Sequence, residues 1–184
     1  MTLRTFIAVD IGALEELVKL EEELDAIGAN LKMVEPKNIH LTLKFLGDTA
    51  DDQVDEIVRI IEDCVKDIKP FNLELEGTGA FPNLNYIKVI WVGVNDHGIL
   101  GPVARNLNSE LTGLGFKSEK RGFSPHITLA RVKSPQNKKQ LKELILKYKD
   151  KTFQKLQIDK ICLKKSILDS KGPTYYTLGE INLS

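Results

Sequence analysis

A four-residue pattern of histidine, aliphatic residue, threonine and aliphatic residue occurs twice in this chain of 184 residues. It reads HLTL at His40–Leu43 and HITL at His126–Leu129, and the two copies hold two of the three histidines. Residues two apart on a β-strand point to the same face. Each copy therefore predicts a strand that presents an imidazole and a hydroxyl on one side and two aliphatic side chains on the other.

The two copies lie 86 residues apart, which is close to half of the chain length. The same shift places the strand-like segment Thr5–Asp10 on Trp91–Asp96 and the helix-like segment Leu14–Ile27 on Leu100–Gly113. In both helical segments apolar residues recur at helical spacing. The sequence therefore predicts a single domain over residues 1–184 that contains an internal repeat of about 86 residues.

Further elements complete each repeat. Amphipathic helices are predicted over Asp51–Ile68 and Gln136–Tyr148, and alternating strands over Asn72–Glu76 and Leu156–Lys164. Each repeat then reads strand, helix, strand, helix, strand. The pattern predicts a bilobal α+β fold with a pseudo-twofold relation, in which two mainly antiparallel sheets line a central cleft and helices cover the outer faces.

The composition bears on the cellular location of this protein. Hydrophobic residues make up 42% and charged residues 28% of the chain, and no stretch approaches the roughly 20 apolar residues of a membrane span. The first residues lack the basic start and long apolar stretch of a signal peptide. We therefore expect a cytoplasmic protein with no membrane partner. No long apolar stripe demands a partner chain, so we expect a monomer.

Neither cysteine pairs nor metal-ligand spacings are present. Cys64 and Cys162 are far apart, without a second cysteine or a histidine at ligand spacing. Both are expected in the core. The sequence gives no indication of a metal or another cofactor.

The formal charge balances at 26 basic and 26 acidic residues, but its distribution is uneven. Residues 1–113 hold 10 Lys and Arg against 20 Asp and Glu, whereas residues 114–184 hold 16 against 6. This asymmetry has two interpretations. It provides a basic face that attracts phosphates, or it reflects a solvated Lys-rich helix around Lys138–Lys151.

Two imidazoles and two hydroxyls around one groove suit acid–base chemistry at phosphorus. In-line displacement at phosphate requires a proton removed from the entering oxygen and a proton delivered to the leaving oxygen on the opposite side. Imidazole titrates near pH 6.5, so one ring can be neutral while the other is protonated. Threonine hydroxyls can donate to the non-bridging oxygens. The residues therefore predict a metal-independent reaction of a phosphate ester.

The paired motifs, together with RTFIAVDI, IHLTLKFLGD, VIWVGV, FSPHITLARV and SILDSKGPTYYTLGEI, resemble the two-histidine (2H) phosphoesterase superfamily. Within it, the chain is most similar to the RNA 2',3'-cyclic phosphodiesterases, also called 2'-5' RNA ligases. The resemblance implies a positively charged central cleft and hydrolysis of 2',3'-cyclic phosphate ends of RNA to 2'-phosphates. It also implies a weak, reversible, ATP-independent joining of tRNA halves through a 2'-5' linkage.

The resemblance also implies roles for particular residues. His40 matches the proton donor and His126 the proton acceptor, although the motif spacing by itself leaves the assignment of acid and base open. Thr42 and Thr128 match the phosphate-binding positions. Arg131 lies where such enzymes carry an arginine, a useful cation beside a phosphate.

Strand parity sets an expectation for the positions beyond each motif. Five residues after His126, Arg131 should point away from the groove unless the strand ends or bulges there. Its counterpart at the repeat spacing, Phe45, is expected to pack in the core. His97 precedes a glycine and is expected in an exposed turn.

Three aromatic residues, Phe123, Tyr175 and Tyr176, either stack a base or belong to the buried part of a sheet. Substrate choice is expected to depend on loops that flank the groove, at Lys32–Asn38, Asp48–Asp52 and Ser166–Thr174.

Two alternatives to RNA 2',3'-cyclic phosphodiesterase activity stay open. The first is a nucleotide- or RNA-binding module on the same fold that turns nothing over. The second keeps the enzyme class but changes the substrate to ADP-ribose 1″,2″-cyclic phosphate, 2'-5' linked oligoadenylates or RNA tails.

Overall fold

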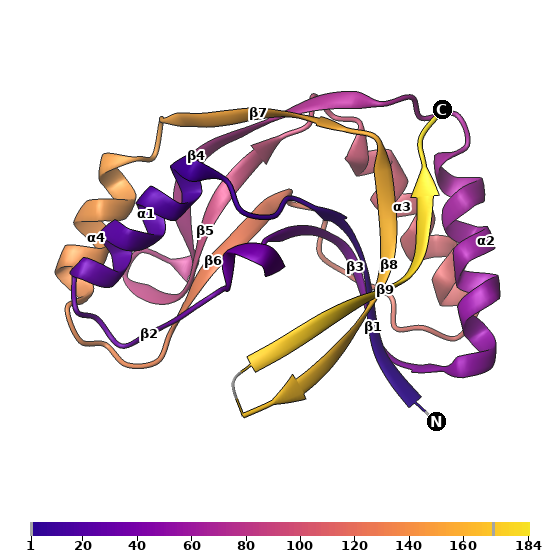
Figure 1. Cartoon of the computed structure of the whole chain (residues 1–184), viewed down its shortest axis with the longest axis horizontal. Helices are drawn as coiled ribbons and strands as arrows, with labels where there is room; N and C mark the ends of the chain where they lie inside the picture. Colours follow the sequence, from indigo (N-terminus) through magenta and orange to yellow (C-terminus); the bar gives the residue numbers. More distant parts are fainter. Residues whose placement is uncertain (1, 171) are drawn as a thin grey trace.

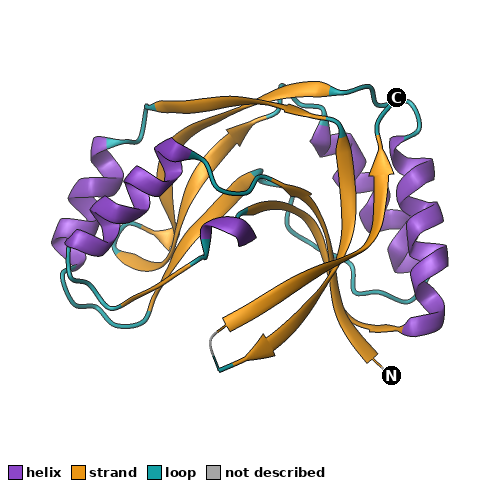
Figure 2. Ribbon diagram, in the orientation of Figure 1, coloured by secondary structure: helices purple, strands orange, loops and turns teal. Residues whose placement is uncertain are grey.

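The strands that begin with the two motifs lie side by side in the middle of one curled sheet (Figures 1 and 2). The computed structural model describes residues 2–170 and 172–184. Its nine strands are β1 Thr2–Asp10, β2 Leu31–Met33, β3 His40–Ala50, β4 Phe71–Asn83, β5 Tyr86–Asn95, β6 His126–Val132, β7 Thr152–Ile158, β8 Lys160–Asp169 and β9 Gly172–Asn182. The order is β7-β4-β5-β6-β3-β1-β8-β9, β2 pairs with β6, and the pairs are antiparallel.

Helices cover one face of each half of the sheet. They are α1 Glu15–Ala26, α2 Val54–Val65, α3 Leu100–Gly113 and α4 Lys138–Lys147, with 3-10 turns η1 Pro36–Asn38 and η2 Asp51–Gln53. Figure 1 shows α1 and α4 outside the half formed by β4 to β7, and α2 and α3 outside the other half. The helices bury the apolar stripes that their sequences predict, for example Leu17, Leu20 and Leu24 of α1. The expected α+β class, with helices outside and one sheet face open, is confirmed.

The join between the two halves is narrow. The register between β3 and β6 consists of one pair, Leu41 with Ile127. The two sheets expected from the sequence are thus two halves of a single curled sheet, continuous through the motif strands.

Each half draws on both parts of the chain. The half with β3 and β1 also contains β8, β9 and α3, and the half with β5 and β6 also contains β4 and α1. The two halves therefore do not coincide with the two 86-residue segments. The internal repeat itself stays a prediction.

The segment Leu156–Lys164 is two strands, not one. The chain leaves β7 at Ile158 and enters β8 at Lys160, and these strands pair with β4 and β1 in different halves. The alternation of residues 156–158 breaks at Asp159 and Lys160, which are two successive polar residues, and an apolar run follows at 161–163. A single strand over the whole segment ignores this break, which marks where the chain crosses between the halves.

The expected loop Ser166–Thr174 is largely the end of the β8–β9 hairpin, apart from residue 171, which lies outside the described residues. This hairpin reaches the segment before β3, because the Asn38 amide donates to the Pro173 carbonyl at 3.1 Å.

Part of the charge asymmetry is neutralised by ion pairs between the basic and the acidic segments of the chain. Four lysines of the basic segment pair with carboxylates of the acidic segment, in the pairs Lys147–Glu23, Lys151–Glu16, Lys155–Glu74 and Lys164–Asp10. The first three are exposed enough to contribute little individually. The Lys-rich end of the chain thus serves to neutralise acidic neighbours as well as to face solvent.

The expectations for the cysteines and for His97 hold. Cys162 is buried and Cys64 is partly buried against the core, and both are free. His97 is exposed in a turn with φ of 54°. Within residues 2–170 and 172–184, no helix combines the length and hydropathy of a membrane span.

Candidate active site

The motif side chains converge on the face of the sheet that the helices leave uncovered, which we call the site face. Leu41 and Ile127 are fully buried on the opposite face. Antiparallel pairing at these two residues sets His40 across from Thr128 and Thr42 across from His126. Such cross-strand neighbours are about 5 Å apart and diagonal neighbours about 7–8 Å. The two imidazoles therefore occupy opposite corners of a four-residue cluster.

Both imidazoles are held in the same way. His40 Nδ1 lies 2.7 Å from the Asn38 carbonyl oxygen, and His126 Nδ1 lies 2.7 Å from the Ser124 carbonyl oxygen. A carbonyl oxygen only accepts, so Nδ1 must carry the hydrogen in each ring. This leaves both Nε2 atoms available, as an acceptor when the ring is neutral and as a donor when it is protonated.

Aromatic rings support each imidazole from the side. His40 packs against Phe6 and Tyr175, with ring centroids 4.9 Å and 5.3 Å away. His126 packs against Phe81 at 4.9 Å and Trp91 at 6.4 Å. These contacts restrict the rings to one orientation, as proton transfer in a fixed geometry requires.

The Trp91 indole depends on a glycine. A Cβ at Gly79 would lie 2.2 Å from the indole ring, so only glycine leaves the space that Trp91 fills beneath His126. Sequence reasoning did not single out Phe6, Phe81 or Trp91, because these residues come from strands whose place beside the motifs is decided by the tertiary fold.

The surroundings of His40 favour its neutral form in the free protein. Burial lowers the pKa of His40, and the charges of Lys164 and His126 act in the same direction. The bond to the Asn38 carbonyl and the nearby Asp10 carboxylate oppose this shift in the pKa. Asp10 pairs directly with His40 in the β1–β3 ladder and contacts Lys164 Nζ at 2.6 Å. A bound phosphate anion would favour the protonated ring.

This arrangement predicts a specific titration. The pKa of His40 in the free protein should lie below that of an exposed histidine, and bound inorganic phosphate should raise it. Asp10→Asn should lower the pKa further, because it removes a negative charge that favours the imidazolium and leaves Lys164 unneutralised. Imidazole Cε1–H resonances followed by NMR against pH would measure this. Asp48→Asn, at the far end of β3, is the matched control, and equal His40 titrations in the two variants would contradict the electrostatic account.

Two bulges decide where the residues after the motifs point. The β1–β3 register skips Leu43, and the β5–β6 register skips Leu129, the equivalent position of the second motif. One extra residue reverses the alternation of side chains. Phe45 and Arg131 therefore emerge on the site face. The expectation that Phe45 packs in the core is wrong, since 63% of it is exposed.

Arg131 lies near the His40 end of the cluster. Burial raises the pKa of the Tyr175 phenol, and the positive charge of Arg131 opposes that shift in the pKa, which places the guanidinium within electrostatic reach of the Tyr175 ring beside His40. Lys32 of β2 pairs with Arg131, so the two cations lie side by side on the sheet. Lys32 falls in a segment expected to flank the groove, although its role as a neighbour of Arg131 could not be foreseen.

The three aromatic residues that the sequence offers for base stacking lie in different environments. Tyr175 is on the site face, whereas its neighbour Tyr176 is exposed and lies under the Lys165 ammonium. Phe123 packs against the core. Among the described residues, no group of three His, Cys, Asp or Glu side chains is placed to hold a metal ion.

Comparison with known sequences places this geometry in a family. Residues 10–167 match the 2'-5' RNA ligase superfamily. This chain belongs to that superfamily. It is 38% identical over 180 residues to the RNA 2',3'-cyclic phosphodiesterase of Methanocaldococcus jannaschii, covering 97% of this chain and 99% of the relative. It is 35% identical over 177 residues to the protein of the same name from Methanothermobacter thermautotrophicus, covering 95% and 96%.

Solved structures share the fold of this chain. TT0787 of Thermus thermophilus superposes with a TM-score of 0.82 at 27% identity, over 98% of both chains. LigT of E. coli complexed with 3'-AMP superposes with a TM-score of 0.74 at 22% identity, over 100% of this chain and 99% of LigT. The resemblance to this superfamily noted in the sequence is confirmed.

Proposed function

We propose that this protein hydrolyses the 2',3'-cyclic phosphate ends of RNA to 2'-phosphates. The observation that carries the proposal is the pair of Nδ1-anchored imidazoles at opposite corners of one cluster, with a threonine beside each. Relatives that span nearly the whole chain are named RNA 2',3'-cyclic phosphodiesterase, which supports this substrate class.

The proposed reaction uses both rings at once. Nε2 of His126 accepts a proton from water as the water oxygen attacks phosphorus. The bond from phosphorus to the 3' oxygen breaks, and Nε2 of His40 donates a proton to that oxygen. The products are a 3'-hydroxyl and a 2'-phosphate. Thr42 and Thr128 donate hydrogen bonds to the non-bridging oxygens, where negative charge increases in the transition state.

If His40 is the acid, its ring must be protonated when the substrate is bound. Because burial lowers the pKa of His40, this ring must acquire its proton when the anionic phosphate binds. Binding of the anionic substrate thus favours the protonated form of His40 that the reaction needs.

The direct test is incubation of the purified protein, in the presence of a chelator, with an RNA oligomer ending in a 2',3'-cyclic phosphate. Identification of the terminal phosphate should show a 2'-phosphate, and both single histidine variants should lose it. Strict dependence on added metal, or a 3'-phosphate product, would overturn the mechanism. Retained nucleotide binding without turnover in the wild-type protein would favour the binding-module alternative, and turnover of only another cyclic or 2'-5' linked nucleotide would replace the substrate.

Phe45 is proposed to stack a base of the RNA. It is exposed on the site face and pairs with Phe6, whose ring contacts His40. Phe45→Ala should raise KM for the oligomer by roughly tenfold, as expected for the loss of one base–aromatic contact, while kcat changes little. Tyr176→Ala, which removes an exposed ring on the other side of the sheet, is the control. Equal KM values for the wild-type protein and Phe45→Ala would remove Phe45 from the substrate site.

We also propose a ligation activity, a location in the cell and an oligomeric state for this protein. Reversal of the cleavage at high end concentrations would join tRNA halves through a 2'-5' linkage without ATP. We propose that the protein acts in the cytoplasm as a monomer. Incubation of 2',3'-cyclic phosphate and 5'-hydroxyl tRNA halves without ATP tests ligation, and sedimentation equilibrium tests the monomer.

A further inference from the structure

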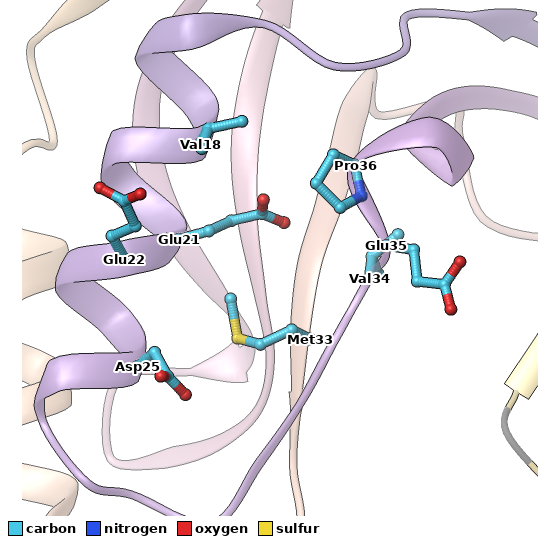
Figure 3. A pocket seen from close by; sticks show the side chains of 8 residues that line it. All are labelled: Val18, Glu21, Glu22, Asp25, Met33, Val34, Glu35 and Pro36. Atoms are coloured by element: carbon cyan, nitrogen blue, oxygen red, sulfur yellow. The ribbon is translucent and has the colours of Figure 1, made fainter.

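A pocket outside the catalytic cluster lies between α1 and the segment from β2 to η1. Its volume is about 330 Å³. Four carboxylates line it, and none of its eight described lining residues is basic. Its apolar walls include Met33 and Pro36, and the carboxylates are Glu21, Glu22, Asp25 and Glu35 (Figure 3).

Glu21 distinguishes this pocket from an ordinary acidic surface. Only 8% of the residue is exposed, and within the described part of the chain its Oε1 atom has no hydrogen-bond partner. Figure 3 shows its side chain extending from α1 into the space before Pro36. Burial raises the pKa of Glu21 to about 7. A buried carboxyl oxygen without a partner is unfavourable, so a ligand that donates to it would gain a strong interaction.

The fold does not require a carboxylate at this position. At the predicted repeat spacing of 86 residues, Glu21 of α1 corresponds to Leu107 of α3, which is fully buried in the core. An apolar side chain therefore satisfies the packing of the equivalent helix. The presence of Glu21 calls for another explanation than helix packing.

The chemistry of the lining favours an organic cation over a metal ion. The described His, Cys, Asp and Glu side chains include no group of three that could hold a metal. One of the rim carboxylates, Glu35, already pairs with Lys37 at 2.9 Å. Glu22 and Asp25 lie exposed on α1, the helix that also carries the buried Glu21. Met33 and Pro36 form apolar walls on the other side of the pocket. Separated negative charges beside apolar walls match ammonium groups joined by methylene chains.

We propose that this pocket binds a linear aliphatic polyamine, with one ammonium group donating to Glu21 Oε1 and a second near the rim carboxylates of α1. The methylene chain lies against Met33 and Pro36. Binding converts Glu21 fully to the carboxylate, because the ammonium group stabilises the charged form.

Calorimetric titration of the full chain with spermidine, in the absence of RNA, tests the proposal. The variants are Glu21→Gln, which keeps the shape of the side chain, and Glu62→Gln, which removes the same charge from an exposed position on α2. Glu21→Gln should weaken spermidine binding at least about tenfold, as for loss of one partner of a buried charge pair, and Glu62→Gln should not. Near pH 7, wild-type binding should release protons, measured in buffers of different ionisation enthalpy, and Glu21→Gln should abolish that release.

Several results would overturn the proposal. They are equal affinities of the wild-type protein and Glu21→Gln, equal weakening by both variants, no binding of spermidine at millimolar concentration, and Mg²⁺ binding at the same site with equal or greater affinity. Thermal melting of Glu21→Gln establishes that it is folded. The proposal does not depend on the phosphodiesterase activity, and Glu21→Gln is expected to retain turnover in the absence of polyamine.

Discussion

Replacement of His40 or His126 by alanine is expected to lower kcat on an RNA 2',3'-cyclic phosphate by a factor on the order of 10²–10⁴, the usual contribution of a positioned proton-transfer group. Both rings lie on the site face with Nδ1 fixed by a backbone carbonyl, so each presents one Nε2 to the substrate. Single-turnover rates with saturating oligomer measure the effect directly. The double variant should be little slower than either single variant, because acid and base act in one step.

The controls separate chemistry from folding. His97→Ala removes the remaining histidine from an exposed turn and should leave kcat unchanged. Thermal melting should establish that His40→Ala keeps its fold, since Phe6 and Tyr175 lose a packing neighbour in that variant. A folded variant with wild-type kcat would remove that histidine from the mechanism.

The sequence alone was sufficient for the parts of the fold that depend on local periodicity. The helix predicted over Leu100–Gly113 is α3, and the strand predicted from Thr5 to Asp10 lies within β1. The faces of the motif residues followed from alternation by two. These features are local, so no knowledge of neighbouring strands was needed.

Features set by strand pairing could not be derived in the same way. The bulges at Leu43 and Leu129 bury two successive residues, Leu43 with Lys44 and Leu129 with Ala130. The order of residues along one strand does not show which residue the partner strand will skip. For that reason strand parity alone predicts the wrong face for Phe45. Likewise Tyr175 reaches His40 from β9, more than a hundred residues away in the sequence, through a hairpin that the sequence did not indicate.

Replacement of Arg131 by glutamine is expected to lower kcat/KM by roughly 10²- to 10³-fold, comparable to the loss of one donor to a developing negative charge. The bulge at Leu129 turns Arg131 to the site face, where its charge reaches the Tyr175 ring beside His40. Because a guanidinium donates through a planar fork that an ammonium lacks, Arg131→Lys should recover only part of the loss. Kinetics at fixed ionic strength, with kcat and KM resolved separately, measure both variants.

Lys165→Gln is the matched control for Arg131, because it removes one positive charge from the strand β8, where the ammonium lies over the exposed Tyr176 ring and not at the catalytic cluster. If long-range attraction of RNA were the whole effect of Arg131, both variants would lose similar amounts of kcat/KM and both losses would shrink with added salt. A direct contact with the phosphate instead predicts a large loss for Arg131→Gln alone that persists at high salt. Equal, salt-sensitive losses would therefore move Arg131 from the substrate site to the general electrostatic field of the protein.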